Sequence, residues 1–134
     1  MKISAVQFRS FPGDATANIE RHLEFIELSI TLGVELVVFP EFALSAPVYA
    51  DADELAEKLA ISVPNEHTER FERKARDLGI WIQCGSFLEV DPRRPNAVFN
   101  TTLLIGPEGI LTRYRKVNPW IPWEVHASPH DLPG

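Results

Sequence analysis

Leu36-Val37-Val38-Phe39-Pro40-Glu41 is an apolar run that ends in a proline and a carboxylate. Apolar and polar residues do not alternate in it, which is typical of a strand covered on both faces of a sheet. We therefore predict a buried strand over residues 35–40. Glu41 then follows the end of this strand, where the edge of a sheet opens into a pocket.

The residues before this strand predict another strand and a helix that packs on the sheet. The first strand is expected over residues 3–8, and Asp14 or Thr16 can cap the helix that follows. Gly33 suits the position just beyond the end of that helix. Strand, helix and strand in this order indicate an α/β protein. The helix has one apolar stripe, formed by Ile19, Leu23, Ile26 and Ile30.

The residues after this strand predict a further helix and an antiparallel meander. Apolar spacing favours a helix over residues 68–78. Strands are expected over residues 80–90 and 98–105, and a polar turn with two prolines over residues 91–96 joins them into a hairpin. A third antiparallel strand over residues 110–116 then brings a lysine to its end.

The segment Arg113-Tyr114-Arg115-Lys116-Val117-Asn118-Pro119-Trp120-Ile121-Pro122-Trp123-Glu124 has the features of a rigid loop. Pro119 and Pro122 fix their own φ angles and favour extended backbone at the preceding residues. A rigid loop with Lys116 at one end and Glu124 at the other can hold both charges at a dry site. We expect the fold to bring Glu41 to the same place.

The composition limits the class of protein. A length of 134 residues allows at most one domain, and the net charge of −6 argues against a nucleic-acid partner. The single cysteine rules out an internal disulfide framework and fits the reducing cytoplasm. Residues 1–8 do not form a secretory signal, and no apolar run is long enough to span a bilayer. We expect a cytoplasmic protein without a membrane partner.

Four motifs stand out, in residues 2–8, in residues 38–41, in residues 85–89 with 99–101, and in Arg115-Lys116. They resemble motifs of the nitrilase superfamily, the carbon–nitrogen hydrolases. The resemblance implies the N-terminal part of the α-β-β-α sandwich of that superfamily, so that residues 1–134 form a partial carbon–nitrogen hydrolase domain. The third catalytic residue of the superfamily is a cysteine on a later strand-to-helix turn, and we expect it beyond this chain.

The resemblance also implies the chemistry. In this superfamily a glutamate is the base, a lysine stabilises the developing negative charge, and a cysteine is the nucleophile. Glu41 and Lys116 match the first two by motif. In the aliphatic amidase and formamidase branch, a Pro-Trp-x-Pro segment and a second glutamate follow the lysine, as Glu124 does here. Trp120 and Trp123 would wall the substrate pocket.

The implied activity is hydrolysis of a small linear amide to an acid and ammonia, without a cofactor or a metal. The expected partner is a small amide or nitrile substrate, and the full-length protein would be a homo-oligomer. A nitrilase and an N-carbamoyl amidohydrolase are alternatives within the enzyme class. A catalytically inactive fragment that binds a partner is the alternative from a different class.

Each candidate residue also has a structural interpretation. Glu41 could be a solvated strand end, Lys116 one of several surface cations, and Glu124 part of a salt bridge at the rim. The two tryptophans could simply fill volume.

Cys84 is the only thiol, but its position among Ile80 and Ile82 predicts a buried, inert cysteine. His126 and His130 have the spacing of metal ligands on a helix, yet Ser128-Pro129 opposes a helix there and no third ligand is evident. We therefore predict a structural Cys84 and no metal site.

Overall fold

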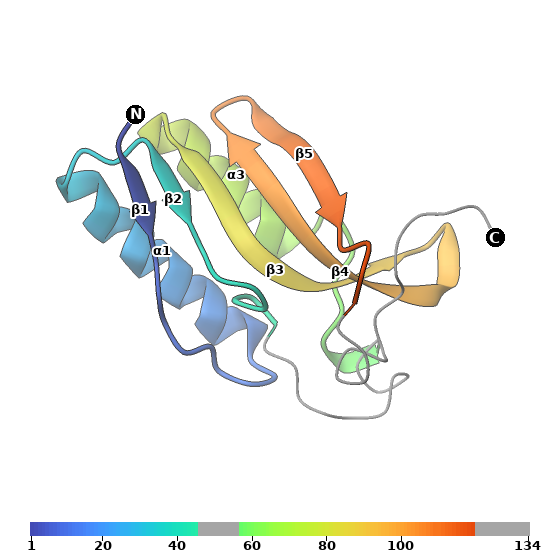
Figure 1. Cartoon of the computed structure of the whole chain (residues 1–134). Coiled ribbons are helices and arrows are strands. Elements are labelled where there is room, and N and C mark those ends of the chain that lie inside the picture. The colour runs from blue at the N-terminus through green and yellow to red at the C-terminus, as the bar shows by residue number, and fades with distance from the viewer. Residues whose placement is uncertain (46–56, 120–134) are drawn as a thin grey trace.

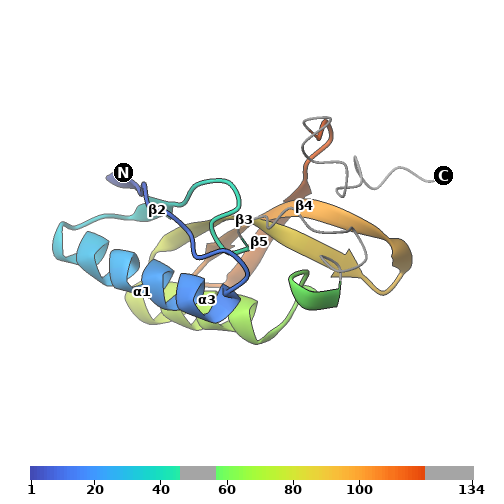
Figure 2. The same ribbon diagram turned by 90° about the horizontal axis from the view of Figure 1, so that it is seen from below.

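The computed structural model describes residues 1–45 and 57–119 (Figure 1). In this part of the chain, five strands form one sheet in the order β1-β2-β3-β4-β5. Two helices, α1 and α3, cover one face of the sheet (Figure 2). None of the described helices is both long and apolar enough to cross a membrane. The elements are β1 (Ile3–Ala5), α1 (Ala15–Thr31), β2 (Leu36–Val38), α3 (Glu66–Leu78), β3 (Trp81–Asp91), β4 (Arg94–Gly106) and β5 (Gly109–Arg115).

The predicted strand-helix-strand unit is present and consists of β1, α1 and β2. β2 pairs in parallel with β1 on one side and with β3 on the other, and Val37 at its centre is fully buried. The strand β2 has three residues rather than the six predicted over residues 35–40. The amide of Phe39 still donates to the Gln83 carbonyl at 3.1 Å. Pro40 has no amide hydrogen with which to extend the ladder.

The helix α1 follows the sequence closely. The Asp14 side chain caps it by accepting from the amide of Ala17 at 2.8 Å. Ile19 and Ile26 are fully buried, and the other two residues of the predicted stripe pack against the same core. Gly33 lies beyond the end of the helix with φ of 70°, a conformation that glycine adopts at little cost.

The helix α3 begins two residues earlier than predicted, because Asn65 caps it. The Asn65 side chain accepts from the amide of Thr68, and the Thr68 hydroxyl accepts from the amide of Asn65, each at 2.9 Å. This reciprocal capping box satisfies two amides of the helix start that otherwise lack partners. Gly79 ends the helix in the left-handed conformation, with φ of 66°.

The meander β3-β4-β5 is antiparallel as predicted, but its first turn is tighter. Asp91 pairs with Arg94, so only Pro92 and Arg93 form the turn, instead of the predicted residues 91–96. The Asp91 carboxylate accepts from the amide of Arg93 at 3.0 Å. That contact closes a short turn that the two prolines alone would not indicate.

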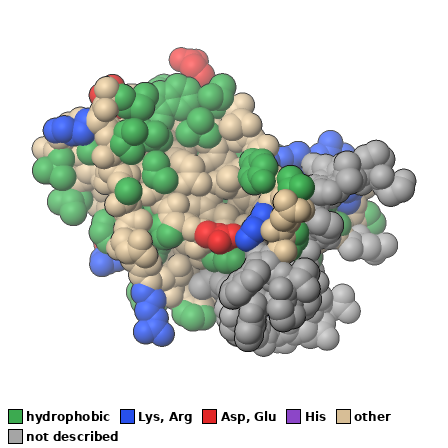
Figure 3. Space-filling view, viewed as in Figure 1, with side chains coloured by type: hydrophobic (Ala, Val, Ile, Leu, Met, Phe, Trp, Pro, Cys, Tyr) green, Lys and Arg blue, Asp and Glu red, His purple; other side chains and the backbone are tan. Residues whose placement is uncertain are grey.

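The two faces of the sheet differ in character. The main core lies between the sheet and the helices, and its largest fully buried side chains include Phe71, Phe87 and Leu103. Hydrophobic side chains also gather on the opposite face (Figure 3). We call this opposite face the outer face. Register and alternation place Trp81, Leu104 and Tyr114 on it, and the Tyr114 side chain is exposed.

His22 lies inside the main core as a neutral imidazole. Its ring centroid is 4.2 Å from that of Phe39 and 5.3 Å from that of Phe71. Nδ1 lies 2.6 Å from the Asn18 carbonyl oxygen and Nε2 3.2 Å from that of Cys84. Burial lowers the pKa of His22 to about 4, although contact with the two carbonyls favours protonation.

We predict that the chain loses stability as the pH falls from about 6.5 to about 4. The unfolded chain binds a proton at His22 with an ordinary pKa of 6.5, whereas the folded state does so only near 4, so acid favours unfolding. The effect at the lower end of this window is on the order of 3 kcal/mol.

Denaturant unfolding of the wild type and of His22→Gln, near pH 7 and near pH 4, measures this effect. Between pH 7 and pH 4, the free energy of unfolding should fall further in the wild type than in the variant, by on the order of 3 kcal/mol. Equal losses in the two proteins would contradict the assignment.

Candidate active site

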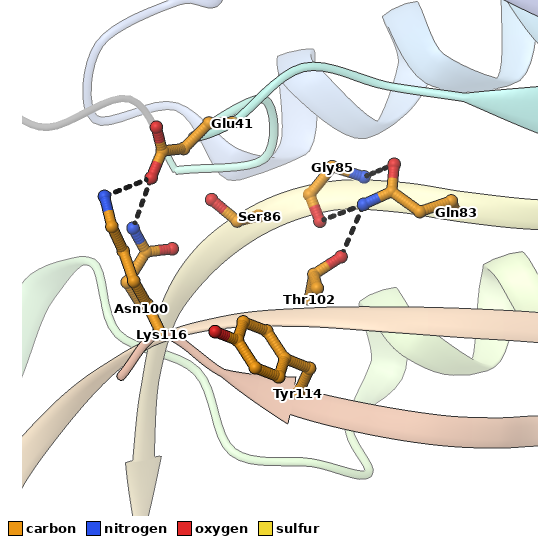
Figure 4. A pocket seen from close by; sticks show the side chains of 8 residues that line it. All are labelled: Glu41, Gln83, Gly85, Ser86, Asn100, Thr102, Tyr114 and Lys116. Atoms are coloured by element: carbon orange, nitrogen blue, oxygen red, sulfur yellow. Dashed lines mark hydrogen bonds and ion pairs between the residues drawn. The ribbon is translucent and has the colours of Figure 1, made fainter. Parts of the chain in front are cut away.

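The fold brings Glu41 and Lys116 together, although they are 75 residues apart in the sequence. Lys116 Nζ lies 2.9 Å from Glu41 Oε1 (Figure 4). Glu41 lies in the turn after β2, and Lys116 is the first residue after β5. The other sequence-derived candidates, Trp120, Trp123, Glu124, His126 and His130, lie outside the described residues.

Asn100 is the third member of this cluster. Its Nδ2 donates to the same Glu41 Oε1 at 2.9 Å, and its carbonyl oxygen accepts from the amide of Lys116 at 2.8 Å. Asn100 therefore contacts the carboxylate through its side chain and the lysine through its backbone. It appeared in the sequence only as part of a motif, because no local pattern says which strand residue faces a distant glutamate.

These residues line an open pocket of about 350 Å³ at the outer face. The Glu41 side chain is 53% exposed and that of Lys116 is 27% exposed. The described residues alone therefore do not form the dry site expected from the sequence, and residues 120–124 of the loop expected to enclose it lie outside them. The lining residues are Glu41, Gln83, Gly85, Ser86, Asn100, Thr102, Tyr114 and Lys116 (Figure 4).

The turn that carries Glu41 is held in an unusual conformation. Phe42, the next residue, has φ of 54°, in the left-handed region that side chains rarely adopt. Ser86 Oγ accepts from the Phe42 amide at 2.8 Å, and Ser10 Oγ donates to the Phe42 carbonyl at 3.2 Å. Backbone strain of this kind persists only where the surroundings impose it, and it is concentrated at functional sites.

Gly85 allows this turn to lie directly on β3. It has φ of 75° and occupies an irregularity in the ladder between Gln83 and Ser86. A Cβ at this position would lie 2.4 Å from the Pro40 carbonyl oxygen and 2.7 Å from Ala43 Cβ. Both distances are shorter than real Cβ contacts, so any other residue would force the turn away from the strand.

Gln83 links the three strands beneath the pocket. Its Nε2 donates to Thr102 Oγ1 at 2.6 Å, and its Oε1 accepts from the amides of Phe39 and Gly85 at 3.2 and 3.3 Å. Thus the side chain on β3 is bonded to β4 and to the residue that follows β2. The floor of the pocket is therefore a connected polar network rather than separate groups.

Cys84 is fully buried on the opposite side of β3, as predicted. Burial raises the pKa of its thiol to about 11, so the thiolate needed for attack does not form near neutral pH. Within residues 1–45 and 57–119, no three His, Cys, Asp or Glu side chains gather in a way that could hold a metal ion.

Comparison with known proteins identifies relatives over nearly the whole chain. The family model described as carbon-nitrogen hydrolase matches residues 2–132. Omega-amidase NIT2 of Xenopus tropicalis is 31% identical over 134 residues, which are 99% of this chain and 43% of that protein. Formamidase of Helicobacter acinonychis (strain Sheeba) is 27% identical over 129 residues, which are 91% of this chain and 38% of that protein.

A solved structure confirms the predicted fold class. Saccharomyces cerevisiae Nit3, a member of branch 10 of the nitrilase superfamily, superposes with a TM-score of 0.81 at 26% identity. The match covers 98% of this chain and 49% of that structure. The chain spans less than half the length of the two curated relatives, at 43% and 38%.

Replacing Gly85 with alanine should be more destabilising than the same change at Gly79. Both glycines have left-handed φ angles, so each substitution introduces backbone strain of about 1–2 kcal/mol. Nothing lies within 4 Å of a Cβ at Gly79, whereas the one at Gly85 meets Pro40 and Ala43. The additional cost at Gly85 should be about 1–3 kcal/mol.

Denaturant unfolding of Gly85→Ala and Gly79→Ala, each compared with the wild type, measures this difference. Equal destabilisation by both variants would mean that the Glu41 turn does not rest on β3.

Proposed function

Because this chain belongs to the carbon–nitrogen hydrolase family, we propose that it supplies the base and the electrostatic stabiliser of a centre that hydrolyses a small aliphatic amide to an acid and ammonia. The observation that carries the proposal is the 2.9 Å contact between Lys116 Nζ and Glu41 Oε1 at the mouth of a pocket. The names of relatives, an omega-amidase and a formamidase, support an amide as the substrate.

In the proposed reaction, Glu41 accepts the proton of a cysteine thiol, and the thiolate attacks the amide carbon. Lys116 stabilises the negative charge that develops on the substrate oxygen. Collapse of the tetrahedral intermediate, with proton transfer from Glu41 to the leaving nitrogen, releases ammonia and leaves a thioester. Glu41 then takes a proton from water, which attacks the thioester carbonyl. Collapse of this second tetrahedral intermediate releases the acid, and Glu41 returns the proton to the leaving thiolate, which restores the thiol and the carboxylate.

The contacts of Glu41 suit this role. Asn100 and Lys116 both donate to Oε1, and none of the described residues donates to Oε2. The carboxylate is thus held by one oxygen while the other is available for a proton. The carboxylate and the ammonium lie beside one another on the same pocket wall, so one small substrate can contact both (Figure 4).

The nucleophile is not among these residues. The sequence has a single cysteine, and Cys84 is buried behind β3 with its pKa raised to about 11. We propose that the third catalytic residue is a cysteine outside this chain and that the whole protein is a homo-oligomer in the cytoplasm. The same observation supports the second candidate function, an inactive chain that binds a partner. A nitrilase or an N-carbamoyl amidohydrolase remain the alternatives for the whole enzyme.

The 134-residue chain alone should release no ammonia from formamide or acetamide, because it has no reactive thiol. An enzyme-coupled ammonia assay on the purified chain measures this. Turnover that disappears in Cys84→Ala would show that Cys84 is the nucleophile after all, against its burial and raised pKa.

In a longer protein that contains both this chain and the proposed cysteine nucleophile, Glu41→Gln and Lys116→Met should each reduce kcat about 100-fold to 10,000-fold. Each change nearly preserves volume, so the fold should be retained. Glu24→Gln is a matched control, because Glu24 forms an exposed pair with Arg21 at 2.6 Å on α1. That variant should keep wild-type kinetics. Wild-type kcat in Glu41→Gln would rule out the proposed base.

Glu124→Gln should reduce kcat about 100-fold on a small amide if Glu124 orients the substrate. A salt bridge at the rim would contribute less than about 1 kcal/mol and leave kcat nearly unchanged. Kinetics with formamide, acetamide, a carbamoyl amino acid and a simple nitrile distinguish the branches. A wild-type preference for the nitrile would contradict the amidase assignment.

A further inference from the structure

Glu89 is a buried carboxylate that joins three strands. Its side chain is 1% exposed. Oε1 accepts from Arg113 Nη1 at 2.9 Å and from Arg115 Nη2 at 2.6 Å. Oε2 accepts from Thr101 Oγ1 at 2.6 Å and from Arg115 Nε at 2.8 Å. The donors come from β4 and β5, whereas Glu89 belongs to β3.

Arg115 is held by this carboxylate in a single orientation. It contacts both oxygens of Glu89 through two different nitrogens, and it also donates to Asp91 Oδ2 at 2.9 Å. Its guanidinium carbon lies 4.0 Å from the centroid of the Phe99 ring. A planar fork of donors bound at two points and stacked on an aromatic ring leaves little rotational freedom.

This cluster lies directly behind the candidate site. Thr101 and Arg115 are cross-strand partners at the end of the β4–β5 ladder. Neighbouring residues of a strand point to opposite faces, so Asn100 points to the outer face. Lys116 follows Arg115 and continues the ladder through its amide, which donates to the Asn100 carbonyl at 2.8 Å. The two residues that contact Glu41 are therefore each adjacent in sequence to a residue that contacts Glu89.

The cluster also separates the positive charges of the basic run. The sequence places Arg113, Arg115 and Lys116 close together, as on a solvated surface. In the fold, Arg113 and Arg115 donate to Glu89 on the helix-covered side, while Lys116 contacts Glu41 at the pocket. A buried carboxylate that binds two guanidinium groups keeps them from competing for the Glu41 carboxylate.

We propose that Glu89 is a positioning residue for Lys116. Through Arg115 it fixes the end of β5 on β4, and this fixes the lysine beside Glu41 and the pocket. A residue that acts on the reaction needs such support, because a displacement of about 1 Å in a catalytic group can cost a factor of about 100 in rate. The catalytic part of this inference rests on the proposed function, whereas the structural part does not.

Amide hydrogen exchange in the 134-residue chain tests the structural part. In Glu89→Gln, the amide of Lys116 should exchange about tenfold or more faster, because its bond to Asn100 opens. The amides of Leu103 and Leu104, further along the ladder of β4, should keep their wild-type rates. Glu27→Gln is the matched control, because it makes the same chemical change in a pair with Lys74 that joins the two helices. It should leave the exchange of Lys116 unchanged.

Arg115→Lys provides a second test, in case Glu89→Gln does not fold. Lysine keeps the charge but loses the two-point contact, so the exchange of the residue 116 amide should increase by less than in Glu89→Gln. Unchanged exchange at Lys116 in either folded variant would overturn the proposal. Equal acceleration at Lys116 and in the middle of β4 would also overturn it, since that result indicates general destabilisation.

Steady-state kinetics test the catalytic part of the proposal. They need a longer protein that contains both this chain and the proposed cysteine nucleophile. Glu89→Gln should lower kcat about 100-fold with little change in KM, because Lys116 acts on the developing charge rather than on substrate binding. If the wild-type protein hydrolyses no amide, the proposed function fails and the exchange data alone decide the positioning role. If it is active and kcat is unchanged in Glu89→Gln, the positioning role in catalysis fails.

Discussion

The ladder that β4 forms with β3 and β5 sets the distance between the charged groups of the site. Asn100 lies in β4, opposite Leu88 on β3, and its carbonyl receives the amide of Lys116 at the end of β5. Its side chain meanwhile donates to Glu41. Backbone hydrogen bonds fix this register. Asn100 therefore contacts Lys116 through its backbone and Glu41 through its side chain, and the lysine and the carboxylate meet beside it. A shift of one residue would turn Asn100 towards the helices and separate the pair.

The sheet also distributes its charges between two faces. On the helix-covered side, Glu89 and Asp91 bind arginines, and the side chains of these two carboxylates and of Arg115 are buried. At the outer face, Lys116 contacts Glu41 in an open pocket. Arg93 and Arg115 together hold the pKa of Asp91 well below its ordinary value through hydrogen bonds, so this carboxylate stays ionised. Alternation along three paired strands thus separates structural ion pairs from the pair proposed to act in catalysis.

The turn that carries Glu41 depends on Gly85 in the strand beneath it and on a left-handed backbone at Phe42. Gly85 lets the Pro40 carbonyl approach β3 more closely than a side chain would allow, and the serine hydroxyl at position 86 holds the Phe42 amide. The left-handed Phe42 follows from these contacts rather than from its own preference. A carboxylate on a turn constrained in this way keeps its position although half of its surface is exposed.

The amino-acid sequence by itself was sufficient for the order of the described elements, though not for the lengths of β1 and β2 or for the β3–β4 turn, and for two of the pocket residues. Periodicity and capping residues predicted α1, the buried β2 and the meander, because these signals are local. Motif resemblance selected Glu41 and Lys116. Only the tertiary structure showed that Asn100 joins them, that Gly85 allows the turn to approach β3, and that Arg115 points inwards to Glu89. These contacts link residues from different strands, and their formation depends on the register of the sheet, which no local pattern in a single sequence specifies.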